Sequence, residues 1–93
     1  MIRSFKNTMT EVVFAGRCPK GFPARLLKVA RRKLEAINAA SILQDLAVPP
    51  GNKLHPLVAD REGQHSIWIN AQFRVCFVWM NGDAFEVEIV DYH

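Results

Sequence analysis

The fold is decided by residues 73–90, which read FRVCFVWMNGDAFEVEIV. Two segments rich in β-branched and aromatic residues flank Asn81-Gly82-Asp83, and an Asn-Gly pair between such segments is typical of a tight turn in a β-hairpin. The segments 73–80 and 85–89 therefore predict two antiparallel strands. Apolar residues alternate with Glu86 and Glu88 in the second strand, which indicates that one face of the hairpin is buried.

The length of the turn determines which residues share a face. If the loop is the three residues 81–83, Met80 pairs with Ala84. One face then collects the apolar side chains of both strands: Phe73, Val75, Phe77, Trp79, Phe85, Val87 and Ile89. A two-residue loop would instead set Phe77 opposite Glu86. The three-residue loop is favoured because it separates the apolar residues from the polar ones.

This register has a consequence for the opposite face of the hairpin. Arg74 lies there, beside Val90 and diagonal to Tyr92. Upstream, residues 66–70 predict another strand, residues 53–57 a short strand that Pro56 interrupts, and residues 2–5 a short opening strand. We expect helices to cover one face of the resulting sheet, so that Arg74 and Tyr92 meet on the other.

The first half of the chain predicts helices instead. Thr8 and Glu11 stand at capping-box spacing, which predicts a short helix over residues 8–15. After Pro23, one apolar stripe recurs at intervals of three and four residues: Leu27, Ala30, Leu34 and Ile37. A second capping box, Ser41 with Gln44, opens a short helix through Leu46. The sequence thus predicts an α+β fold, a compact helical hairpin packed on one face of a mainly antiparallel sheet.

Length and composition limit the class of protein. The chain has 93 residues, which suits one domain over residues 1–93, and no apolar run approaches the roughly 20 residues of a membrane-spanning helix. The first residues lack the apolar stretch of a signal peptide, so we expect a cytoplasmic protein without a membrane partner. Cys18 and Cys76 have no metal-site spacing, and we expect two reduced thiols with Cys76 in the core.

Charge is distributed unevenly along the chain. Residues 1–48 hold nine Lys and Arg against three acids, whereas residues 49–93 hold three against six. Arg25, Lys28 and Arg32 follow helical spacing on a side away from the apolar stripe. A basic helix face of this kind attracts a phosphate backbone or the acidic surface of a protein partner, although it is also compatible with a simple solvated face.

The polar residues near the strands suit phosphodiester cleavage. The sequence has no Gly-rich phosphate loop, Gly-x-Ser-x-Gly or Cys-x-x-Cys motif. Cleavage of RNA by its own 2′-hydroxyl needs a base, a positive charge at the phosphorane and a proton donor to the leaving oxygen. Those tasks fit six residues without a metal or other cofactor: Lys53, His55, Arg74, Asp91, Tyr92 and His93. Either histidine can be the base, and the planar Arg74 guanidinium is the better phosphate clamp.

Each of these residues also has a purely structural interpretation. His55 precedes Pro56 and could be a turn histidine, Arg74 could pair with Glu86 or Glu88, and residues 91–93 could be a frayed end. A metal site built from His55, Asp91 and His93 lacks the i, i+4 pair or tight cluster that such sites show. We therefore expect no metal site.

Six segments in order resemble the HigB toxins, the plasmid-maintenance killer branch of the RelE superfamily. They are Lys53-Leu54-His55-Pro56-Leu57, Asp60-Arg61-Glu62-Gly63, Ser66-Ile67, Phe73-Arg74-Val75-Cys76-Phe77, Asn81-Gly82-Asp83-Ala84 and the final Asp91-Tyr92-His93. The likeness begins at Met1-Ile2-Arg3-Ser4-Phe5, and the ending from Val87 is similar to the GraT members.

The resemblance implies a ribosome-dependent endoribonuclease, or mRNA interferase, that cuts translated mRNA in the ribosomal A site and inhibits growth. It implies a RelE-like fold, a HigA-type helix-turn-helix antitoxin, and operator DNA bound through the antitoxin complex. It carries over five catalytic positions: His55, Arg74, Asp91, Tyr92 and His93. For RNA binding we expect Lys53, Gln72, Arg25, Lys28 and Arg32. Some HigB proteins have a lysine where this chain has Val58-Ala59, which predicts a milder toxin.

Two other functions are compatible with the sequence. One is a non-catalytic module whose basic helix docks on ribosomal RNA or on the antitoxin. The other is a chain that acts mainly as corepressor of its operon. Loss of activity in His93→Gln with ribosome association retained would distinguish an enzyme from a binding module, and strong growth inhibition without antitoxin would argue against a corepressor.

Overall fold

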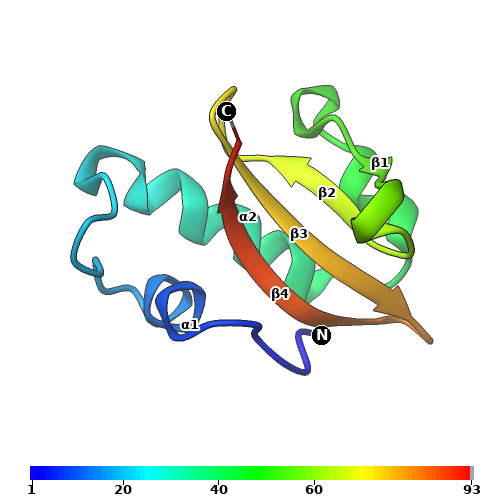
Figure 1. The fold of residues 1–93 in the computed structure, drawn as a ribbon. Helices are drawn as coiled ribbons and strands as arrows, with labels where there is room; N and C mark the ends of the chain where they lie inside the picture. The colour runs from blue at the N-terminus through cyan, green and yellow to red at the C-terminus, as the bar shows by residue number, and fades with distance from the viewer. Residues whose placement is uncertain (93) are drawn as a thin grey trace.

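The computed structural model describes residues 1–92 and consists of a helical layer and an antiparallel sheet (Figure 1). The elements in chain order are α1 (Thr8–Phe14), the 3-10 helix η1 (Ala24–Leu26), α2 (Leu27–Ala39), the 3-10 helices η2 (Leu43–Ala47) and η3 (Pro50–Asn52), β1 (His55–Pro56), the 3-10 helix η4 (Ala59–Arg61), β2 (His65–Trp68), β3 (Phe73–Met80) and β4 (Asp83–Asp91). The strands pair in the order β1-β2-β3-β4, each antiparallel to its neighbour.

The turn between β3 and β4 is shorter than the sequence predicts. Met80 pairs with Asp83, so the loop is Asn81-Gly82 alone. Both residues have positive φ, 53° and 82°, which is the backbone that an Asn-Gly hairpin turn requires. The predicted pairing of Met80 with Ala84 is therefore wrong at this end of the hairpin.

A β-bulge then restores the predicted register. Glu86 adopts φ 53°, and the pairing shifts by one residue between Cys76 and Val78. Beyond the bulge Arg74 pairs with Val90, as the sequence predicts. The small Ala84, fully buried, takes the core position next to the turn, while Phe85 pairs with Val78 on the other face. The prediction that Phe85 lies in the core is therefore wrong.

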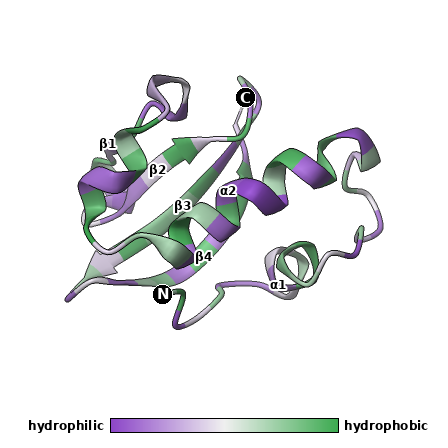
Figure 2. Ribbon diagram, turned by 180° about the vertical axis from the view of Figure 1, so that it is seen from behind, coloured by the Kyte–Doolittle hydropathy of each residue, from purple (hydrophilic) through white to green (hydrophobic). Residues whose placement is uncertain are grey.

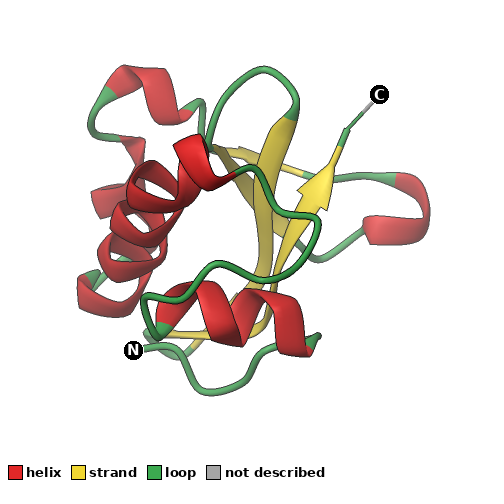
Figure 3. Cartoon of the chain, turned by 90° about the vertical axis from the view of Figure 1, so that its left-hand side faces the viewer, coloured by secondary structure: helices red, strands yellow, loops and turns green. Residues whose placement is uncertain are grey.

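Two α-helices cover one face of the sheet, which confirms the predicted α+β class. Figure 3 shows α1 and α2 together on one side of the strands. The apolar stripe of α2 buries Ala30, Leu34 and Ile37. The cap of α1 is Asn7, whose side chain accepts the Thr10 N–H at 2.9 Å, so Thr8 is the first helical residue and does not form the predicted capping box.

The predicted partner of α2 in a helical hairpin is a 3-10 helix. The Asp45 carboxylate accepts the backbone N–H groups of Ser41 and Ile42, at 2.9 and 3.2 Å, which caps the start of η2. The buried Asn52 then donates to the carbonyls of Leu46 and Val48 at 3.1 and 3.2 Å. These bonds fix the long connection to β1, and the helix that packs beside α2 is α1.

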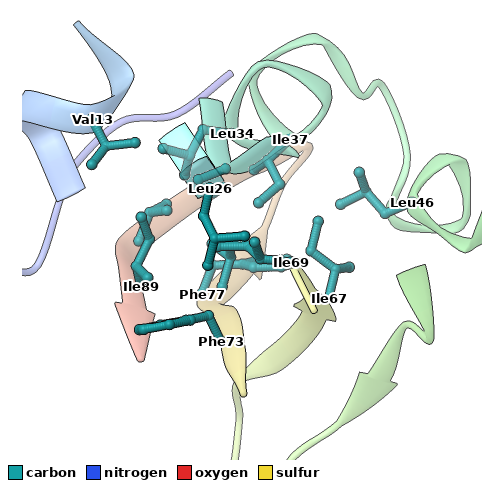
Figure 4. Packing of buried hydrophobic residues seen from close by; sticks show 14 of the residues in the cluster. Val13, Leu26, Leu34, Ile37, Leu46, Ile67, Ile69, Phe73, Phe77 and Ile89 are labelled. Carbon is teal, nitrogen blue, oxygen red and sulfur yellow. The ribbon is translucent and has the colours of Figure 1, made fainter. Parts of the chain in front are cut away.

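The core lies between the helical layer and β2, β3 and β4. Figure 4 shows Leu34 and Ile37 of α2 pointing toward Phe77 of β3 and Ile67 of β2. The predicted opening strand runs parallel to β4 through bridges of Ile2 with Ala84 and of Phe5 with Val87. Within residues 1–92, no helix is both long and apolar enough to cross a bilayer.

Candidate active site

The face of the sheet away from the helices, the open face, carries a row of cationic and aromatic side chains. The Lys53 ammonium lies 4.3 Å from the centre of a Trp68 ring, and the Arg74 guanidinium carbon lies 3.9 Å from a Trp68 ring centre. The same guanidinium lies 5.1 Å from the centre of the Tyr92 ring. Residues from four successive parts of the chain are thus in contact, and Arg74 and Tyr92 meet as the sequence predicts.

His55 belongs to the same face. It pairs with Ser66, which in turn pairs with Cys76 of β3. Cys76 lies two residues after Arg74, and alternate residues of a strand point to the same side of the sheet. Its side chain is exposed, and its Nδ1 lies 3.1 Å from the Lys53 carbonyl oxygen. That carbonyl is oriented by the left-handed backbone of Lys53, at φ 50° and ψ 49°. A carbonyl oxygen only accepts, so Nδ1 carries the proton and the Nε2 lone pair is left for an incoming proton.

Tyr92 is positioned by contacts on three sides. Its backbone N–H donates to the Gln72 carbonyl at 2.6 Å, and its ring contacts Arg74. Tyr92 also lies close enough to Cys76, a fully buried residue of β3, to affect the pKa of its thiol. Burial raises the pKa of the Cys76 thiol, with smaller opposing effects from the Arg61 charge and from Tyr92. Burial therefore keeps the Cys76 thiol in its neutral form.

An ion pair lies beside this row of side chains. Arg61 of η4 donates to the Glu88 carboxylate of β4 at 2.8 Å, and to the Gln64 side chain at 3.1 Å. The bond to Glu88 raises the pKa of the guanidinium. Glu88 thus pairs with Arg61, and Arg74 donates instead to the Ala71 carbonyl at 3.3 Å. The structural interpretation in which Arg74 pairs with Glu88 is not supported.

The side chains of Asp91 and Gln72 bond to each other and not to Arg74 or Tyr92, although the Gln72 backbone carbonyl binds the Tyr92 N–H. Asp91 pairs with Phe73, a core-facing residue, and its carboxylate accepts the Gln72 amide at 3.1 and 3.3 Å. It also lines a cavity of about 200 Å³ beside Phe22 and Lys20. The structure therefore brings together Lys53, His55, Arg74 and Tyr92. His93 lies outside the described residues.

The predicted basic residues of η1 and α2 lie in the helical layer, on the far side of the core. Arg25, Lys28 and Arg32 are exposed, and Figure 2, which looks onto this layer, shows hydrophilic stretches along α2. Lys28 and Arg32 line a shallow depression of about 510 Å³ that Glu35 also borders. Because the sheet separates them from the open face, they cannot reach the same phosphate as Arg74.

Among residues 1–92, no group of three His, Cys, Asp or Glu side chains is placed to hold a metal ion. His65 has a buried Nδ1 with no hydrogen-bond partner, and its ring stacks on Phe77 at 6.4 Å. Burial, followed by the nearby His55, lowers the pKa of His65. His65 is thus a neutral histidine of the core side, unlike the exposed His55.

Sequence reasoning missed Trp68, Arg61 and Glu88 as residues of this face. The alternation in β2 could have indicated Trp68, because Ile67 and Ile69 are buried and their neighbour must point the other way. Its contact with Arg74 depends on the β2-β3 register, in which the two residues pair directly. Arg61 and Glu88 are 27 residues apart, and no local pattern connects them.

Such a face, with cations, a histidine and a tyrosine over exposed sheet, can bind a phosphodiester and move protons around it. The family model described as "RelE-like toxin of type II toxin-antitoxin system HigB" matches residues 3–93. The chain belongs to the HigB-like toxins. As a toxin of a type II system it has a cognate antitoxin.

Relatives with names agree with this assignment. The HigB-like chain is 38% identical over 93 residues to "Endoribonuclease HigB" of Proteus vulgaris, and all of both chains is covered. It is 39% identical over 62 residues to "Toxin HigB-1" of Vibrio cholerae, with 67% of this chain and 65% of that one covered. The structure of YafQ from E. coli BL21(DE3) is similar at a TM-score of 0.55 and 12% identity, covering 98% and 93% of the two chains, which shows the fold.

Proposed function

We propose that this HigB-like toxin is a ribosome-dependent endoribonuclease that cuts translated mRNA in the ribosomal A site and so inhibits translation and growth. The observation that carries the proposal is the convergence of Lys53, His55, Arg74 and Tyr92 on the open face. The name of the Proteus vulgaris relative, similar over its whole length, supports the same chemistry. Residues 1–93 would act as one toxin domain in the cytoplasm.

His55 is our choice for the general base. Its Nδ1–H donates to the Lys53 carbonyl, which holds the neutral ring in the tautomer whose Nε2 can accept the proton of the ribose 2′-hydroxyl. The oxygen then attacks the adjacent phosphorus, and the 5′-oxygen leaves with a proton from a donor on the other side. By likeness to the family, Tyr92 or His93 is that donor, and no metal is needed.

Arg74 and Lys53 supply the positive charge for the phosphorane. Negative charge grows on the non-bridging oxygens in the transition state, and a fixed guanidinium there stabilises it more than the ground state. Asp91 supports the site indirectly. Its carboxylate binds the side-chain amide of Gln72, and the backbone carbonyl of Gln72 accepts the Tyr92 N–H. Gln72 is thereby an RNA-binding candidate at the edge of the same face.

The partners proposed are a HigA-type helix-turn-helix antitoxin, operator DNA bound through the antitoxin complex, and the ribosome. The exposed cations Arg25 of η1 and Lys28 and Arg32 of α2 suit contact with ribosomal RNA or with acidic antitoxin. Because the core separates them from the open face, docking through α2 would leave Arg74 and Tyr92 free to meet mRNA.

The test is induction of untagged variants in bacteria that lack the antitoxin, with growth and new mRNA 5′ ends followed together. His55→Gln and His93→Gln should remove both effects. His65→Gln is the matched control, because it replaces a histidine of the adjacent strand that points away from the open face. Toxin abundance is measured in each strain, so that loss of protein is not counted as loss of catalysis.

Growth arrest with cuts confined to translated messages, lost in His55→Gln and His93→Gln and kept in His65→Gln, is the expected result. Arrest without new 5′ ends, or arrest unchanged in both variants, would favour a non-catalytic module that binds the ribosome. No arrest at all from abundant wild-type protein would favour an operon corepressor.

A further inference from the structure

We propose that Trp68 is a positioning residue of the nuclease, whose indole holds the Lys53 and Arg74 cations in place over the open face. The inference rests on the proposed function, since it concerns the same site. It does not follow from the sequence, because Trp68 takes part through contacts that depend on how β2 pairs with β3 and on where the chain before β1 lies.

The geometry places Trp68 between the two cations. Trp68 pairs directly with Arg74 across β2 and β3. His55 pairs with Ser66 across β1 and β2, and Lys53, which precedes β1, places its ammonium over the Trp68 ring. One indole therefore receives a lysine from one side of β2 and an arginine from the other, at 4.3 and 3.9 Å.

The contact restricts two long side chains that would otherwise be mobile. Both distances are within the roughly 6 Å at which a cation is attracted to the negative face of an aromatic ring, and tryptophan is the strongest such ring. Lysine and arginine carry the largest rotamer entropy of the side chains, so a ring that fixes them before RNA binds lowers the entropy lost in the transition state. The row of side chains ends with Tyr92, whose ring centre lies 5.1 Å from the Arg74 guanidinium carbon.

The same contact overcomes a repulsion. Two cations held close to one another repel, and in solvent the flexible side chains would separate. The indole attracts both, which concentrates positive charge where a phosphate must sit. When RNA covers the face and excludes water, the cation–π contacts strengthen, so the effect grows as the reaction proceeds.

Direct stacking of a nucleobase on Trp68 is the competing role. The cations already occupy the indole at contact distance, which favours a role through Arg74 and Lys53 over a role on the RNA. A double-mutant cycle separates the two, because a positioning residue loses its effect once the group it positions is gone.

The experiment measures single-turnover cleavage on ribosomes programmed with a short message. Trp68→Leu should slow cleavage about 5- to 30-fold, the range that the loss of one or two cation–π contacts gives, while Trp68→Phe should retain activity within about threefold. In the Arg74→Ala background, Trp68→Leu should cost less than it does in the wild type, because only the Lys53 contact is left to lose, and with Lys53→Ala added as well it should cost less than about twofold. Trp79→Phe is the matched control, and urea unfolding of each variant checks that the fold is kept.

Tryptophan fluorescence gives a readout that is independent of activity. The chain has two tryptophans, so in the Trp79→Phe variant the emission comes from Trp68. Arg74→Ala or Lys53→Ala should then change the intensity or wavelength of Trp68 emission. If the wild type cuts RNA and Trp68→Leu stays within twofold of it, the inference fails while the function stands. It also fails if the loss persists undiminished in Arg74→Ala, which would indicate base stacking.

If the wild type does not cut RNA, the proposed function fails and emission decides the inference alone. Unchanged emission in both cation variants would overturn the positioning contact. A clear change in both would support it as a property of the phosphate-binding face.

Discussion

Replacing Glu88 by Gln removes the charge from the ion pair that ties η4 to β4. The pair has an N–O distance of 2.8 Å, and the Arg61 and Glu88 side chains are 30% and 13% exposed. Exposed pairs contribute about 0.2–1 kcal/mol, whereas breaking a fully buried pair costs about 3–5 kcal/mol. With partial burial and one charge-assisted hydrogen bond, Glu88→Gln should lower the free energy of unfolding by about 2 kcal/mol. The assay is urea denaturation followed by circular dichroism.

Glu86→Gln is the matched control for this substitution. Glu86 lies on the same strand, and its replacement by Gln is the same chemical change. Its side chain is exposed, and its backbone φ of 53° is equally unfavourable for Glu and for Gln. Its effect should stay within about 0.5 kcal/mol. If Glu88→Gln also changes stability by less than about 0.5 kcal/mol, or if Glu86→Gln matches it, the reasoning from burial and geometry is refuted.

Three more predictions test other parts of the structure. Burial, followed by the nearby His55, lowers the pKa of His65, so the unfolded chain binds the proton more tightly than the folded one. The free energy of unfolding should therefore fall as the pH drops below about 6.5. His65→Phe should flatten that pH dependence in urea titrations. Cys18 is exposed whereas Cys76 is buried with a raised pKa, so a thiol reagent near neutral pH should label Cys18 in the native protein and Cys76 only in urea, and equal labelling rates would contradict this. Val58 is 78% exposed, so Val58→Lys should increase the cleavage rate without changing stability. An unchanged rate would show that the missing lysine does not explain a milder toxin.

The strands of the second half could be predicted well, because alternation and the Asn-Gly pair are local signals. Residues 73–80 form β3 with the predicted bounds, and Arg74 pairs with Val90. The error lies in the turn, where a two-residue loop and a bulge at Glu86 together give the register that a three-residue loop was expected to give. A bulge depends on how β4 packs against the opening segment, whose Ser4 hydroxyl accepts the Glu86 N–H, and that contact spans 82 residues.

The candidate site was predictable in part. Arg74 and Tyr92 were expected on one face, and they lie there. Trp68 could not be linked to Arg74, because the pairing of β2 with β3 depends on the loop between them and on the whole core. Arg25, Lys28 and Arg32 were assigned to RNA from charge alone, and charge on a helix does not reveal which layer the helix occupies.

The alternation in β3 separates two kinds of mutation. Val75 and Phe77 face the helices and are fully buried, whereas Arg74 faces the open side. A substitution at an open-face position can therefore abolish chemistry in a chain that still folds, while one at a core position removes the protein itself. Survivors selected from bacteria that express this toxin alone should fall into these two classes, and a one-residue deletion within β3 should belong to both at once, since it exchanges the two faces.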